Sequence, residues 1–247
     1  MGRIRLNTEE KVYIGWCHDG EVDAMFAHSI MDLVRLFPER VTHFDSVLGT
    51  GLLAKSRNIL VKNFLDTDAD WLFMVDADEY ITPDAFQKLV NLADKQRHPF
   101  VSGLYFALNF PTAEDFQPIP LIFVNTEDSG IQPYFTYPKN SVVQIYAAGT
   151  GCLLIHRSVL ERLRELGEEE YGRDWAWFMD GPIGANKWLS EDLAFCDRVQ
   201  RAGFKLYAHT GAIVPHHKTI WVTEKTYDDW VIANSGVDSY KTTGFTE

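Results

Sequence analysis

The chain has 247 residues, 46% of them hydrophobic, so it can bury a substantial core as one large α/β domain or two small ones. Its 35 acidic and 23 basic residues give a formal net charge of −12, which argues against a surface built to neutralise nucleic-acid phosphates. The three cysteines show no metal-binding spacing, and their odd number favours reduced thiols in a cytoplasmic protein. No stretch reaches the roughly 18 apolar residues of a membrane-spanning helix, so we expect a soluble chain.

The first predicted unit is a strand followed by a helix. Residues 11–16 alternate as in a strand, and residues 22–37 have the pattern of an amphipathic helix. In doubly wound sheets the first strand-to-helix loop commonly holds a nucleotide, which makes Trp16, His18 and Asp19 candidates to contact a base or ribose. An ordinary crossover turn is the alternative interpretation.

A second strand and a second helix follow, at residues 41–48 and 52–64. This helix carries Lys55 and Arg57 toward the side of the sheet where a ligand would bind. An arginine there could hold a diphosphate through two parallel N–H donors. A solvated charge on the helix surface is the alternative.

The most informative stretch consists of five apolar residues, 71–75, followed at once by Asp76-Ala77-Asp78. Such a short apolar run predicts a strand buried on both faces. Because side chains alternate along a strand, Asp76 and Asp78 would point the same way from its carboxyl end, where α/β sheets bind ligands. Two neighbouring carboxylates need a compensating charge, and a hard divalent metal suits them best. The alternative is a pair of solvated residues in an ordinary loop.

Residues 83–94 predict a helix that begins at Pro83, and residues 100–108 predict a strand. Residues 109–140 contain many prolines and aromatic residues and fit neither a helix nor one long strand. Loops this long are usually functional or disordered, and the aromatic content favours function. We therefore expect an irregular excursion with a small hairpin that forms a wall for an acceptor.

Two apolar strands are predicted at residues 142–147 and 152–155, on either side of Gly149-Thr150-Gly151. The glycines would let the backbone approach a neighbour or a ligand closely. A helix over residues 157–166 follows.

Residues 168–184 have loop character and contain Trp175 and Trp177. Exposed tryptophans often form stacking platforms for sugar rings or bases, whereas buried ones form core clusters. The sequence alone leaves both interpretations open.

Glu191 and Asp192 begin an amphipathic helix that Gly203 ends, with Ser190 as the expected N-cap. A last strand is predicted at residues 204–208.

In the extended segment that follows, His216 and Lys218 would share a face, and a histidine beside an aspartate pair can complete a metal site. We expect one domain over residues 1–218. Residues 219–247 would form a tail with a short helix, packed on the domain or on a partner. The aromatic residues of that tail are Trp221, Tyr227 and Trp230.

Taken together, these segments resemble glycosyltransferases of the GT-A fold, close to the inverting family 2 type. The marks that match, in order, are Ser56-Arg57-Asn58, Val75-Asp76-Ala77-Asp78, Gly149–Arg157, Ser190-Glu191-Asp192 with Phe195-Cys196 and Gly203, and Val214-Pro215-His216. The resemblance implies a single α/β GT-A domain. Its Rossmann-like central sheet would be mixed but mostly parallel and flanked by helices, with a small secondary sheet or hairpin on the acceptor side.

The resemblance also implies a nucleotide-sugar donor, with a UDP-sugar expected, and Mn²⁺ or Mg²⁺ as cofactor. Asp76 would approach the ribose or the metal, Asp78 would coordinate the metal, and His216 would be the third protein ligand. The doubled histidine, His216-His217, leaves the identity of that ligand open. Ala77 and Gly151 would lie against the donor.

Asp192 matches the family's general base, which removes the proton of the acceptor hydroxyl as it attacks the anomeric carbon. Glu191 would be its neighbour in catalysis, and Arg57 and Lys218 would face the nucleotide or its diphosphate. The acceptor could be a protein side chain, a glycan or a modified nucleobase, although the acidic charge makes nucleic acid a poor partner. We expect a cytoplasmic enzyme, in the host cytoplasm for a viral protein, with a homo-oligomer compatible with the sequence.

Two other functions fit parts of the pattern. A non-catalytic module that binds a sugar or nucleotide sugar could keep the fold. A metal-dependent phosphohydrolase could use the same acid pair, but such enzymes place the first aspartate after the opening strand, whereas here Asp76 lies after a later one.

Overall fold

The structure is a computed structural model that describes residues 10–49, 51–109, 116–128, 130–183, 187–220, 223–226 and 229. The chain divides into two compact units, residues 1–107 with 119–217 and residues 108–118 with 218–247. The first unit carries the α/β fold. The expected division into a domain and a tail at residue 218 stays a prediction.

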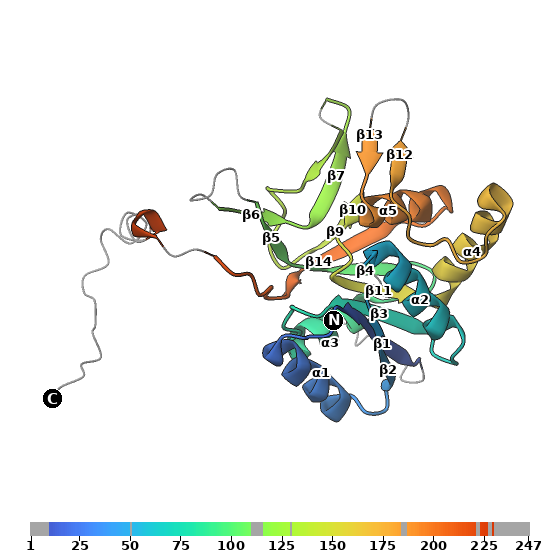
Figure 1. Cartoon of the computed structure of the whole chain (residues 1–247), viewed down its shortest axis with the longest axis horizontal. Coiled ribbons are helices and arrows are strands. Elements are labelled where there is room, and N and C mark those ends of the chain that lie inside the picture. The colour runs from blue at the N-terminus through green and yellow to red at the C-terminus, as the bar shows by residue number, and fades with distance from the viewer. Residues whose placement is uncertain are drawn as a thin grey trace, which may run out of the picture. The chain divides into compact units, whose positions relative to one another are not determined.

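The large sheet has seven strands in the order β2-β1-β3-β11-β4-β14-β9. Five strands run in one direction, and β11 and β9 run in the opposite one. Their bounds are β1 (Val12–His18), β2 (Val41–Leu48), β3 (Trp71–Asp76), β4 (Phe100–Leu104), β9 (Val142–Ile145), β11 (Cys152–His156) and β14 (Leu206–Ile213). The predicted mixed, mostly parallel sheet is thus confirmed (Figure 1).

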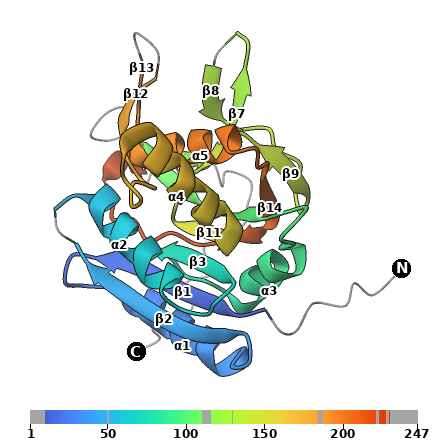
Figure 2. The same ribbon diagram turned by 90° about the vertical axis from the view of Figure 1, so that its right-hand side faces the viewer.

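Helices cover both faces of this sheet. Their bounds are α1 (Ala24–Leu36), α2 (Leu53–Leu65), α3 (Pro83–Leu92), α4 (Arg157–Tyr171) and α5 (Glu191–Arg201). One core lies between the sheet and α2, α4 and α5, and the other lies between the sheet and α1 and α3 (Figures 1 and 2).

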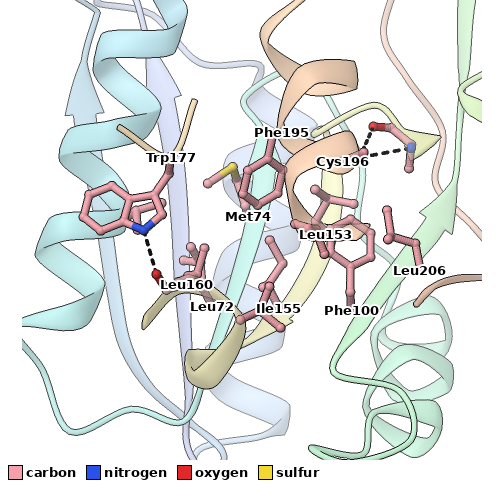
Figure 3. Close-up of a cluster of buried hydrophobic side chains, with 14 of the residues drawn as sticks. Leu72, Met74, Phe100, Leu153, Ile155, Leu160, Trp177, Phe195, Cys196 and Leu206 are labelled. Atoms are coloured by element: carbon pink, nitrogen blue, oxygen red, sulfur yellow. Dashed lines mark hydrogen bonds between the residues drawn. The ribbon is translucent and has the colours of Figure 1, made fainter. Parts of the chain in front are cut away.

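The central strand β3 is buried on both faces, as its apolar run predicts. Leu72 and Met74 point into the first core, which is drawn in Figure 3, while Trp71, Phe73 and Val75 point into the second. All five are exposed by 1% or less. Burial of such side chains contributes about 1.5–3 kcal/mol each, so β3 fixes the frame on which the acid pair stands.

Side-chain hydrogen bonds cap the ends of three helices. The Asp23 carboxylate accepts the N–H groups of the first turn of α1, and Thr82 does the same for α3, where Pro83 occupies the first position. Arg157 closes the C-terminal end of α2. Its guanidinium donates to the carbonyl oxygens of Phe64, Leu65, Thr67 and Ala69.

Several predicted boundaries are wrong. The strand expected at 142–147 is divided into β9, which ends at Ile145 in the large sheet, and β10 (Ala147–Ala148) in a small sheet, where Tyr146 donates its backbone N–H to the carbonyl of Phe123 at 2.8 Å. The expected strand 100–108 is interrupted at Tyr105, because this side chain is buried and its hydroxyl accepts the N–H of Gly151 at 2.8 Å. The helix expected to end at residue 166 continues to Tyr171, since its added acidic turn faces solvent and needs no apolar stripe, and Gly172 ends it at φ 62°. The last strand occupies 206–213 instead of 204–208.

Small sheets accompany the main one, as expected. Their strands are β5 (Phe106–Asn109), β6 (Gln117–Pro120), β7 (Ile122–Thr126), β8 (Gly130–Pro133), β10 (Ala147–Ala148), β12 (Gly181–Ile183) and β13 (Lys187–Leu189). Strands β10, β7 and β8 form one ladder, β12 pairs with β13, and β5 pairs with β6. No helix among the described residues is long and apolar enough to cross a membrane.

Candidate functional site

A cleft of about 810 Å³ opens where β1, β2 and β3 end. Cys17 and His18 line it from the end of β1, Gly49 from the residue after β2, and residues 76–78 from the end of β3. The carboxyl ends of parallel strands are where α/β sheets bind ligands, and the volume is that of a small-molecule site. This cleft is the candidate functional site.

The first strand-to-helix connection forms one wall of the cleft. His18 and Asp19 line it, whereas Trp16 is not among its lining residues and packs edge to face on Phe26 at 5.5 Å between ring centroids. Burial raises the pKa of the Cys17 thiol to about 11, with Arg57 lowering it and Asp76 raising it to smaller extents, so this thiol is protonated at neutral pH.

Arg57 joins two acidic segments that lie far apart in the sequence. Its Nη2 atom donates to Asp76 Oδ1 at 3.3 Å, and its Nη1 atom donates to Glu191 Oε1. The residue is 4% exposed. Burial alone would lower the pKa of the guanidinium, but the charges of Asp76 and Glu191 outweigh it and raise that pKa. The alternative of a solvated helix charge is therefore wrong, and the cation holds the end of β3 to the start of α5.

Asp78 lies beside His216. The Nε2 atom of His216 is 3.1 Å from Asp78 Oδ2, and its Nδ1 atom is 2.8 Å from the carbonyl oxygen of Phe106. A carbonyl can only accept, so Nδ1 carries a proton and Nε2 is left to face the carboxylate. The neighbouring His217 is 2.7 Å from the Asp23 carboxylate and is 64% exposed, so the two histidines have separate partners.

The described residues contain no preassembled set of three His, Cys, Asp or Glu side chains around a common metal position. Asp78 and His216 meet, whereas Asp76 is engaged by Arg57. The expected three-residue ligand set stays a prediction.

Asp192 stands in the first turn of α5. Its Oδ1 atom accepts the N–H of Leu193 at 2.8 Å and the hydroxyl proton of Ser190. Ser190 occupies the N-cap position, but its side chain makes no capping bond to the helix backbone, because the hydroxyl is directed to Asp192. Ser190 is thus the N-cap residue, as predicted, but its hydroxyl orients the Asp192 carboxylate instead of capping the helix.

The Gly149–Gly151 turn packs against Asp76, Glu79 and Tyr105, and both glycines are required by close contact. The carbonyl of Gly151 accepts the N–H of Asp76 at 3.0 Å. A Cβ atom on Gly151 would clash with the Glu79 carboxylate and lie 2.9 Å from Asp76 Oδ2, and one on Gly149 would clash with the Tyr105 hydroxyl. Burial, followed by the charges of Asp76 and Glu79, raises the pKa of Tyr105.

Sequence reasoning missed Glu79, Tyr105 and Asp23. Glu79 is buried behind the acid pair, and Asp23 lines the cleft while it caps α1. The acid that directly follows Asp76-Ala77-Asp78 was the available signal for Glu79. For Asp23, the available signal was its position directly before an amphipathic helix, where an aspartate is a common N-cap.

The two tryptophans of the 168–184 segment divide between the two interpretations. Trp177 is buried, and its indole N–H donates to the carbonyl of Leu160 at 2.8 Å, while Trp175 is 46% exposed.

Lys218, which the sequence predicts to face the diphosphate, belongs to the second unit. Outside the described residues lie the aromatic residues of the expected tail, Trp221, Tyr227 and Trp230.

Comparison with known families decides the class. Residues 37–164 match the model of glycosyl transferase family 2. The chain belongs to this family. The match confirms the resemblance found in the sequence, and it covers Arg57 and the acid pair but ends before Asp192 and His216.

GalNAc-T7 shares the fold of this family 2 chain. GalNAc-T7 with UDP, GalNAc and Mn²⁺ is 12% identical with a TM-score of 0.55 over 87% of this chain, which spans only 45% of that one. A197 from STIV is 18% identical with a TM-score of 0.48 over 80% of this chain and 81% of the other. A search of curated proteins gives no match.

Proposed function

We propose that this family 2 member transfers a sugar from a nucleotide-sugar donor to an acceptor hydroxyl with inversion, assisted by Mn²⁺ or Mg²⁺. The observation that carries the proposal is the Arg57 bridge, which ties the Asp76-Ala77-Asp78 segment to the helix start that holds Asp192. One acidic segment would serve the donor, and the other would serve the acceptor proton.

The pair formed by Asp78 and His216 is suited to a divalent ion. Its Oδ2 and Nε2 atoms are 3.1 Å apart, close to the roughly 3 Å between adjacent ligands of an octahedral ion with bonds of about 2.1 Å. The Nδ1 bond to Phe106 leaves Nε2 available as a ligand. Asp76 would face the same ion or the ribose. When bound, such an ion stabilises the negative charge that develops on a leaving diphosphate.

The chain's own residues would bind the donor and move the proton. His18, Asp19 and Ala77 line the cleft and would contact the nucleoside, while Gly151 gives the close packing behind it. Lys218 is a further candidate for the diphosphate. Asp192, oriented by Ser190, would take the proton of the acceptor hydroxyl, and Glu191 would remain paired with Arg57. General-base help of this kind contributes about 10²–10⁴-fold.

Release of nucleoside diphosphate tests the proposal. A panel of nucleotide sugars, beginning with UDP-sugars because the GalNAc-T7 structure contains UDP, would be incubated with Mn²⁺, with Mg²⁺ or with EDTA. Asp78→Asn should abolish metal-dependent turnover. Asp192→Asn should reduce turnover by about 10²–10⁴-fold and leave donor binding by calorimetry intact. Asp84→Asn, on the exposed surface of α3, is the matched control.

Full turnover in EDTA, or in Asp78→Asn, would remove the metal from the proposal. Donor binding without release of diphosphate under any condition would favour the non-catalytic binding module. The anomeric configuration of the product, measured by NMR, distinguishes inversion from retention.

A further inference from the structure

A second hollow, of about 480 Å³, lies on the outer face of α2, and we call it the α2 groove. From α2 it is lined by Lys55, Asn58, Ile59 and Lys62, whose spacing places them on one face of the helix. From the neighbouring α4 and the segment after it, the groove is lined by Arg164, Trp175 and Trp177; Figure 2 shows α2 and α4 side by side. The α2 residues that line the cleft, Leu53 and Ser56, are not among the groove's lining residues.

The aromatic wall of the α2 groove is held in place by hydrogen bonds. The Asn58 side chain accepts the N–H groups of Trp177 and Phe178 at 3.1 and 2.7 Å and donates to the Phe178 carbonyl at 2.8 Å. From the other side, Arg198 donates to the Trp177 carbonyl at 2.8 Å. These contacts fix the backbone at residues 177 and 178, just after Trp175, so a ligand would not lose binding energy in ordering that part of the wall.

Within this wall, Trp175 keeps an indole surface in contact with solvent. Its side chain is 46% exposed and lines the groove, and the Arg173 guanidinium lies 5.4 Å from its ring centroid. An indole ring beside a preformed hollow is suited to stack on a ligand.

The charges of the α2 groove favour an anion. Lys55, Lys62 and Arg164 have no carboxylate within ion-pair distance in the part of the chain that the structure describes. By contrast, Arg97 and Arg162 each have one such partner and Arg201 has two. The three cations of the groove outnumber its two acids, Asp66 and Asp174, on a chain with a net charge of −12.

The exposed indole ring and the excess of cations together favour a ligand that has both sugar rings and negative charge. We propose that the α2 groove binds an anionic oligosaccharide as a remote part of the acceptor, an inference that rests on the proposed glycosyltransferase function. Trp175 would stack on a sugar ring, and the cations would contact a carboxylate, sulfate or phosphate. Asp66 and Asp174 would accept hydrogen bonds from sugar hydroxyl groups. A single-stranded nucleic acid could also stack on the indole, but the two acids oppose a phosphodiester backbone.

The test is direct binding, by calorimetry and by quenching of tryptophan fluorescence at low and at physiological salt. The probes are a hexamer of galacturonic acid, a chondroitin sulfate hexasaccharide, mannose 6-phosphate, neutral cellohexaose and oligothymidylate. We expect at least one anionic sugar to bind, at least 10-fold more tightly than cellohexaose. Trp175→Ala and Lys62→Glu should each weaken that binding at least 10-fold. Lys205→Glu, an exposed lysine between α5 and β14, should leave it unchanged.

Because Trp175 and Lys62 are both exposed, their variants should keep the wild-type circular dichroism spectrum. The proposal is overturned if no anionic sugar binds, if Lys205→Glu weakens binding as much as Lys62→Glu, or if oligothymidylate binds more tightly than every sugar. Release of nucleoside diphosphate to water, without an acceptor, should be the same in wild type and Trp175→Ala. A wild-type protein that turns over donor but binds no anionic sugar refutes the groove alone. A wild-type protein that binds such a sugar but turns over no donor refutes the proposed function alone.

Discussion

Replacement of Asn58 by alanine should destabilise the fold far more than an ordinary substitution on a helix. The Asn58 side chain is 6% exposed and makes three hydrogen bonds to the backbone of residues 177–178. Each such bond contributes about 1–1.5 kcal/mol net when its partners are left buried, which gives about 3–4 kcal/mol in total. Alanine returns about 0.5 kcal/mol through its higher helix propensity. The expected net loss is about 3 kcal/mol, or about 6 °C in Tm for a chain of this length.

Asn63→Ala is the matched control, because it makes the same change of residue in the same helix. Asn63 is half-buried and donates one side-chain hydrogen bond, to Asp45 at 2.9 Å, so its loss should cost about 0.5 kcal/mol after the same gain in propensity. Urea unfolding followed by circular dichroism measures both variants, and tryptophan emission should shift to the red only in Asn58→Ala. A difference between the two variants below about 1 kcal/mol would show that the bonds to residues 177–178 do not hold this segment.

Three further outcomes follow from contacts described above. Gly151→Ala should abolish donor turnover, because the added methyl group would displace the carboxylates of Glu79 and Asp76. Gly181→Ala, with nothing within 4 Å of its Cβ position, should keep the wild-type rate of turnover. Equal rates in the two variants would contradict the packing around Gly151. Arg157→Lys keeps the charge but cannot donate to the same set of carbonyl groups at the end of α2, so the free energy of unfolding in urea should fall by about 2 kcal/mol. An unchanged urea midpoint would argue against the role of Arg157 as a cap. The hydrogen bond from Arg97 lowers the pKa of Asp94 from 3.8 to about 2, so the stabilisation is present above pH 3.8 and is lost as the pH falls through about 2. Asp94→Asn should therefore cost about 1 kcal/mol at pH 5 and at pH 7, after allowance for solvent exposure, and an NMR titration midpoint for the Asp94 carboxyl near 3.8 would refute the pairing.

Local patterns in the sequence were sufficient to predict most of the sheet. The strand at 41–48 agrees with β2 at both ends, and the apolar run 71–75 agrees with β3 to within one residue. Both predictions depend on local composition and apolar runs, which the side chains of the segment itself determine. The break at Tyr105 could not be predicted in this way. It depends on a contact with Gly151, 46 residues further along the chain.

The functional site likewise combines residues that local patterns predict with contacts between distant residues that they do not. The acid pair and Asp192 are recognisable as motifs, whereas the partners of Arg57 are not, since a helix arginine has the same local sequence whether it is solvated or buried between carboxylates. Asn58 belongs to the Ser56-Arg57-Asn58 motif, yet its role in holding the backbone of Phe178 depends on a segment 120 residues away. Trp175 and Trp177, two residues apart, lie in different environments because one faces a core and the other a groove.

The long sequence separation of the Arg57 bridge has a consequence for the order of synthesis. Glu191 follows Arg57 by 134 residues, and His216 follows Asp78 by 138. At about 5–20 residues per second, a ribosome adds Glu191 roughly 7–27 s after Arg57, so during that time the nascent chain carries this cation with at most one of its two acidic partners. A fragment that ends at residue 164 would therefore contain the whole segment that identifies the family, but it could not close the site.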